Sequence, residues 1–163
     1  MRFAPAAAAL SLFLATTASV TSAQDPAPDP RAIALVTQGR AALQAGDTQG
    51  ATDAFEAALA VDPGYTPIFL ELAEAARSDG LQGKAIRYYR EALARDPENF
   101  AAISGEGAAL VEKGALEKAK RNLARLRSMC GDTCPETEAL KVTIAVGAQR
   151  IAVETNEPGP ASN

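Results

Sequence analysis

Apolar residues in the middle of the chain recur at helical spacing, in short segments separated by turn residues. In one such segment Leu35, Gly39 and Ala42 fall on the same face, with spacings of four and three residues. Capping and turn signals bound seven helices of this kind, at about 30–45, 48–61, 67–79, 82–95, 98–113, 115–129 and 135–151. The pattern therefore predicts an all-α chain.

The helices repeat with a period of 34 residues. The period appears in the turn glycines, in the small residues, in the large residues that follow them and in the Asp-Pro pairs: Gly46, Gly80, Gly114; Ala51, Ala85, Ala119; Phe55, Tyr89, Leu123; Asp62-Pro63, Asp96-Pro97. A helix pair of this length cannot bury its apolar face alone, so stacked copies form the core and leave a curved surface that is typically used for binding.

The residue types within the period indicate how the units pack. The glycines at 46, 80 and 114 are expected to end helices in the left-handed conformation. Small residues at 39, 73 and 107 let helix backbones approach closely, while the side chains at 55, 89 and 123 fill the gaps between units.

These series, together with Ala58 and Ala92, resemble the tetratricopeptide repeat family over three units, 32–65, 66–99 and 100–133. The chain departs from the family where Leu35, Phe69 and Ile103 replace its opening Trp. The resemblance implies a right-handed α-α superhelix, a solenoid of three helix-turn-helix repeats within 31–133, followed by a capping helix at 134–153.

The resemblance also implies that the first helix of each unit lines a concave groove for a peptide or protein partner. The candidate groove residues are Val36, Arg40, Leu43, Gln44, Leu70, Glu74, Arg77, Ser78, Ser104, Ala108, Val111 and Glu112. Arg40 and Arg77 are able to pair with a partner's carboxylate. The alternative is a helix face that is solvated or paired within the chain. The set lacks the Lys and Asn clamp by which some family members hold a C-terminal carboxylate.

The two ends of the chain lie outside the repeats. Residues 1–23 are predicted to be a cleavable signal peptide, because Arg2 precedes a short apolar run and small residues end at Ala23. The alternative, an uncleaved anchor, is disfavoured because the run is shorter than a bilayer needs. We expect disordered segments at 24–30 and 154–163. The product is predicted to be periplasmic, or alternatively secreted, without stable membrane insertion after cleavage.

The amino-acid composition limits which kinds of catalytic and binding site the chain is able to form. The chain has no His, which removes the usual imidazole nucleophile systems and imidazole metal sites. The net charge of −4 disfavours nucleic acid as a partner. Glu71 and Glu74 lie one helical turn apart, but a hydrated helix face explains them better than a catalytic pair. We expect no enzyme activity, no cofactor and no metal.

Cys130 and Cys134 are predicted to form a disulfide, since only a short turn separates them and export leads to an oxidising compartment. A redox-active pair is less favoured because the spacing is not Cys-x-x-Cys. Two thiols alone would leave a metal incompletely coordinated.

For two surfaces the sequence allows more than one interpretation. Basic residues gather on the predicted second helices of units two and three, where a solvated convex face competes with contact to an anionic polymer or lipid headgroup. The last helix is predicted to be a solubilising cap of a monomer, with dimerisation through it as the rival.

The sequence therefore predicts a non-catalytic adaptor that binds a partner polypeptide in its groove. One alternative is a structural subunit of a cell-envelope or cytochrome-assembly complex, held through its outer surface. A more remote alternative is a polysaccharide-acting enzyme.

Overall fold

The computed structural model describes residues 27–156, and over that part of the chain it contains seven helices and no strand. The helices are α1 (Pro30–Gln44), α2 (Thr48–Val61), α3 (Pro67–Ser78), α4 (Gln82–Arg95), α5 (Phe100–Glu112), α6 (Leu116–Cys130) and α7 (Pro135–Asn156). The predicted signal peptide lies outside the described residues, as do 24–26 of the linker and 157–163 of the tail.

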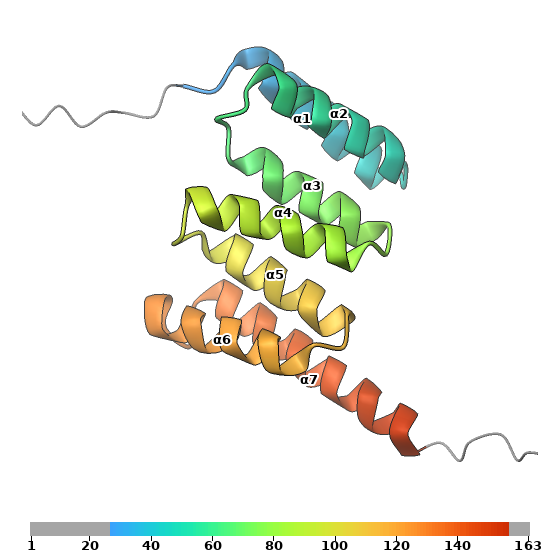
Figure 1. Cartoon of the computed structure of the whole chain (residues 1–163), viewed down its shortest axis with the longest axis vertical. Helices are drawn as coiled ribbons and strands as arrows, with labels where there is room; N and C mark the ends of the chain where they lie inside the picture. The colour runs from blue at the N-terminus through green and yellow to red at the C-terminus, as the bar shows by residue number, and fades with distance from the viewer. Residues whose placement is uncertain (1–26, 157–163) are drawn as a thin grey trace, which may run out of the picture.

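The first six helices form three helical hairpins, α1–α2, α3–α4 and α5–α6, stacked one after another (Figure 1). The second helix of each hairpin contacts the first helix of the next, α2 with α3 and α4 with α5. Helix α7 packs against both α5 and α6. The predicted all-α solenoid is confirmed.

The turns inside the three hairpins are built alike and lie along one edge of the stack (Figure 1). Gly46, Gly80 and Gly114 have φ angles of 82°, 72° and 78°, a region that costs a side chain steric strain. Asp47 then caps α2 by accepting a hydrogen bond of 2.9 Å from the backbone N–H of Gly50. The predicted helix-ending role of these glycines is confirmed.

Two aromatic rings fill the spaces between helix backbones. Phe55 and Tyr89 are fully buried, and each lies against a glycine of a neighbouring helix, Gly39 in α1 and Gly105 in α5. A Cβ atom at either glycine would overlap the ring. Gly105 breaks the pattern of the other units, and its position beneath Tyr89 gives the physical reason for it.

Helix α7 occupies the place of a further first helix. It begins at Pro135, which lies 68 residues, or two periods of 34, after Pro67 at the start of α3. Its buried Leu140 lies against Gly107 of α5, where a Cβ atom would meet the leucine side chain. The helix therefore continues the stack and covers its end.

The far end of α7 differs from the sequence-based expectation. The helix reaches Asn156, past Ile151 and into the segment predicted to be a disordered tail from 154. The residues from Ile151 to Asn156 contain no Gly or Pro, so nothing in them stops a helix that is already formed. Its outer face is also less polar than a cap requires, since Val142, Val146 and Val153 are all exposed.

Candidate functional site: a groove between first helices

The stack contains a hollow of about 440 Å³ between α3, α5 and α7. We call it the central groove. Its lining consists of Glu74, Arg77, Ala101, Ser104, Gly105, Ala108, Pro135, Glu136, Ala139 and Thr143. The floor is made of small side chains, which leaves room for side chains of another molecule, and the charged residues stand on α3 and α7.

The structure brings four of the predicted groove residues together here: Glu74, Arg77, Ser104 and Ala108. Gln44 and Ser78 are exposed at the ends of α1 and α3 and do not line the central groove. Leu43 and Leu70 are half-buried and pack against the core.

Val36 and Val111 were among the predicted groove residues, but the structure buries both away from the central groove. Val36 is only 3% exposed and lies in the core with Ala32 and Phe55. Val111 is 8% exposed and lies beneath Gly147 of α7, where a Cβ atom would meet its Cγ1 atom. Each of these two side chains points toward the neighbouring helices. Helical spacing shows which residues share one face of a helix, but it does not fix which face is turned toward the groove.

Both candidate arginines are already paired within the chain. Arg40 donates to Glu71 of α3, with 2.9 Å between Nε and Oε1. Arg77 binds Glu112 of α5 and also Glu74, with 3.1 Å between its Nη1 and Oε1 of Glu74. The intramolecular pairing that the sequence left as an alternative is therefore what the structure shows, and a partner's carboxylate would have to compete with these glutamates.

The electrostatics of the groove wall centre on Arg77. Its hydrogen bonds to Glu112 raise the pKa of the guanidinium above its usual range. Glu74 of α3 also accepts a hydrogen bond from the hydroxyl of Tyr89, a residue of α4. Burial, followed by the charge of Glu74, raises the pKa of the Tyr89 phenol above its usual range. Glu112, Arg77, Glu74 and Tyr89 therefore form one connected polar network along this wall.

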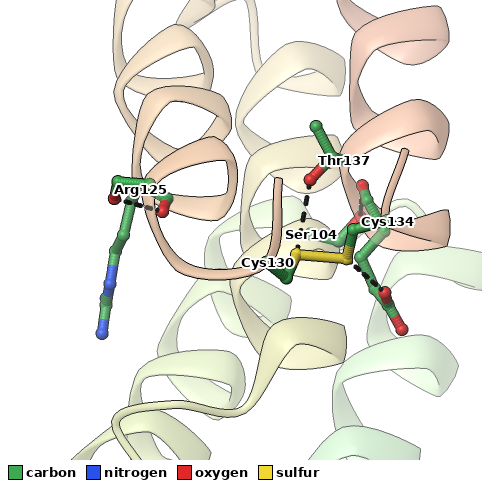
Figure 2. Close-up of a disulfide and its surroundings, with 7 residues drawn as sticks. Ser104, Arg125, Cys130, Cys134 and Thr137 are labelled. Carbon is green, nitrogen blue, oxygen red and sulfur yellow. Dashed lines mark hydrogen bonds between the residues drawn. A yellow bond between two sulfur atoms is a disulfide. The ribbon is translucent and has the colours of Figure 1, made fainter. Parts of the chain in front are cut away.

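The α7 wall of the groove is held by a disulfide (Figure 2). Cys130, the last residue of α6, is bonded to Cys134, with 5.7 Å between their Cα atoms, as the sequence predicts. Directly after it, the backbone carbonyl of Glu136 accepts a hydrogen bond of 3.1 Å from the hydroxyl of Ser104. The fully buried Thr137 places its Oγ1 atom 3.6 Å from the sulfur of Cys130. Together these contacts fix the start of α7 against α5.

Sequence reasoning missed the residues that α7 and the α5 floor contribute. Ala101, Gly105, Glu136, Ala139 and Thr143 line the central groove but were not predicted. The sequence does contain a signal for the α7 residues: Pro135 lies two 34-residue periods after Pro67, which marks α7 as another first helix. Because α7 was predicted only to be a cap, its residues were not among the groove candidates.

Within residues 27–156 no group of three or more Cys, Asp or Glu is arranged to hold a metal ion. None of the helices α1 to α7 combines the length and apolar character needed to cross a bilayer.

Known proteins resemble the chain in sequence over part of its length and in structure over most of it. Residues 36–99 match the sequence model of the tetratricopeptide repeat family. No curated protein sequence matches the chain. Among solved structures, the tetratricopeptide repeat domain of Sgt2 from Aspergillus fumigatus is similar with a TM-score of 0.67 at 22% identity, covering 84% of this chain and 89% of that one.

Two further similar structures contain bound peptides. The first tetratricopeptide repeat domain of Spaghetti (RPAP3), bound to the HSP90 peptide SRMEEVD, has a TM-score of 0.65 at 20% identity, covering 75% of this chain and 94% of that one. The type III secretion chaperone SycD of Yersinia enterocolitica, in complex with a peptide of the translocator YopD, has a TM-score of 0.62 at 20% identity, covering 76% and 94%. The chain thus matches the tetratricopeptide repeat family over residues 36–99, and its described helices have the fold of tetratricopeptide repeat structures.

Proposed function

We propose that this protein is an exported, non-catalytic adaptor that holds a segment of a partner polypeptide in the central groove. The observation that carries the proposal is the groove itself, a hollow of about 440 Å³ open between three first helices. Its small-residue floor suits the side chains of an inserted segment, because a peptide gains contact area only where the receiving surface leaves space.

The charges of the groove wall indicate how the segment is held. Arg77 is engaged by Glu74 and Glu112, so it offers little free positive charge to a carboxylate. Shape and apolar contact with Ala101, Ala108 and Ala139 are therefore expected to supply most of the affinity. The peptide complexes of the RPAP3 and SycD structures support the choice of a polypeptide as the partner.

Export to the periplasm is the second part of the proposal. It rests on the signal-like sequence of residues 1–23 and is supported by the Cys130–Cys134 disulfide, since disulfides persist in oxidising compartments. Protein purified from the periplasm of the producing cell should begin at Gln24 and show no free thiol. Full-length protein in the cytoplasmic fraction would contradict this part of the proposal.

Site-specific photo-crosslinking tests the groove. A photoreactive phenylalanine analogue at Ala139, which lines the central groove, should capture a defined partner in the native compartment. The matched control places the same analogue at Ala57, an exposed alanine of α2 that does not line the groove. Adding the substitution Ala101→Trp should abolish capture from Ala139, because the indole fills the hollow.

The outcomes separate the proposal from its rival. Capture from Ala139 that is lost with Ala101→Trp supports groove binding. Capture from Ala57 alone would overturn groove binding and favour a structural subunit held through its outer surface. Capture from Ala139 that is unchanged by Ala101→Trp would also overturn it, because the partner would not occupy the groove.

A further inference from the structure

A second and larger hollow, of about 670 Å³, lies at the turn between α3 and α4. That turn is at the edge of the stack (Figure 1). We call it the edge hollow. It is bounded by the α3–α4 turn, the start of α4 and the end of α5, and it shares no lining residue with the central groove. It is therefore a separate surface, outside the proposed function.

Three cationic side chains converge on the edge hollow: Lys84 and Arg87 from α4, and Lys113 from the end of α5. The Nζ atom of Lys113 reaches across to Gly83 and would lie 3.7 Å from a Cβ atom placed there. Lys84 and Arg87 both flank the ring of Tyr88, at 5.7 and 5.9 Å from its centroid. Residues from two successive units thus direct positive charge at one place.

These three cations have no carboxylate partner within the described part of the chain. The one acidic residue of the lining, Glu112, is bound by Arg77 and accepts a hydrogen bond of 3.2 Å from Gln82. The excess of positive charge belongs to this surface and not to the chain as a whole, which has a net charge of −4. Unpaired positive charge around a concavity attracts a negatively charged group.

The basic character continues into the next unit. Lys118 and Arg121 of α6 lie 34 residues after Lys84 and Arg87, and both are exposed. The corresponding residues of the first unit are Gly50 and Asp53, so the feature belongs to units two and three. An extended anionic chain seated in the edge hollow would meet further cations along this line.

We propose that the edge hollow and the adjoining basic residues of α6 bind an acidic segment of a partner polypeptide. A polypeptide fits better than a bilayer surface, because the cations surround a hollow that a flat surface cannot enter. Leu81, which is 46% exposed in the lining, offers an apolar contact to a side chain of such a segment.

Fluorescence anisotropy with a labelled hexaglutamate peptide tests the proposal on the chain from Gln24 to Asn163. The unchanged protein should bind the peptide saturably at low salt, and binding should weaken as salt screens the charges. The double variant Lys84→Ala, Lys113→Ala should bind at least about tenfold more weakly. The charge-matched control Lys141→Ala, Arg150→Ala removes two exposed cations of α7 and should bind like the unchanged protein.

Two results would overturn the proposal. One is the absence of saturable hexaglutamate binding, and binding to phosphatidylglycerol vesicles in that case would identify a lipid surface as the ligand. The other is equal loss of binding in the two double variants, which would mean that only overall charge matters. The variant Ala101→Trp should leave hexaglutamate binding intact, so a failure of groove binding remains distinguishable from a failure of this proposal.

Discussion

Tyr89 connects two stacked units through a single side chain. Its ring is 1% exposed and lies against Gly105 of α5, while its hydroxyl donates to Glu74 of α3. The phenol is therefore held between three helices in its neutral form. Ionisation would place a negative charge in the core beside a carboxylate, and that is why burial and Glu74 raise its pKa.

Stability at alkaline pH should depend on this phenol. The pKa of an exposed tyrosine is about 10, and that of Tyr89 in the folded chain is higher. Folding therefore favours the protonated form, and the contribution of Tyr89 to stability is complete below about pH 10 and is lost as the pH rises above it. Urea unfolding at about pH 9 and pH 11 should show a smaller loss of stability for Tyr89→Phe than for the unchanged protein. Equal losses of stability in the two proteins would contradict the raised pKa of Tyr89.

At the scale of elements, α7 completes both the core and the groove. It buries Leu140 against Gly107 and contributes Glu136, Ala139 and Thr143 to the central groove. The disulfide at its start ties it to the end of α6, and the loop-entropy account gives about 2 kcal/mol for closing so small a ring. Since the groove has no third wall without it, α7 is a part of the proposed binding surface.

Truncating the buried face of α7 should destabilise the fold. Leu140→Ala removes a fully buried side chain and is expected to cost about 2–5 kcal/mol of unfolding free energy. Val142→Ala, two residues away and 63% exposed, is the matched control and should cost far less. Chemical denaturation followed by circular dichroism measures both. Similar costs for the two variants would show that α7 does not pack on α5 as described.

At the scale of the whole molecule, the outer face of α7 bears on the oligomeric state. Its exposed Val142, Val146 and Val153 are three separate side chains, and a stable dimer buries roughly 800 Å² per partner. Three valines supply only a part of that area. We therefore expect the isolated protein to be a monomer.

Light scattering of the chain from Gln24 to Asn163 tests this expectation, and it should give the mass of one chain over a wide range of concentrations. A dimer mass would contradict it. If that dimer dissociated in the variant Val142→Lys, Val146→Lys, α7 would be identified as its interface.

The sequence by itself determined the helices and their order. Turn glycines, Asp-Pro pairs and apolar spacing act within a few residues, so α2 and α4 were predicted at their observed bounds and the others within a few residues. The end of α7 was the exception, because no local stop signal stands between Ile151 and Asn156. The disulfide was predictable for the same reason, since its two cysteines are near neighbours in the chain.

Only the tertiary structure decided which residues face the groove and which charges are free. Val36 and Val111 turn into the core, and Arg40 and Arg77 pair with glutamates of neighbouring helices, because rotation and side-chain reach depend on contacts between units. Arg77 and Glu112 are 35 residues apart in sequence, and Lys113 reaches back to Gly83. Short-range patterns specify each helix, whereas these longer contacts exist only once the helices are stacked, so the central groove and the edge hollow became visible only in three dimensions.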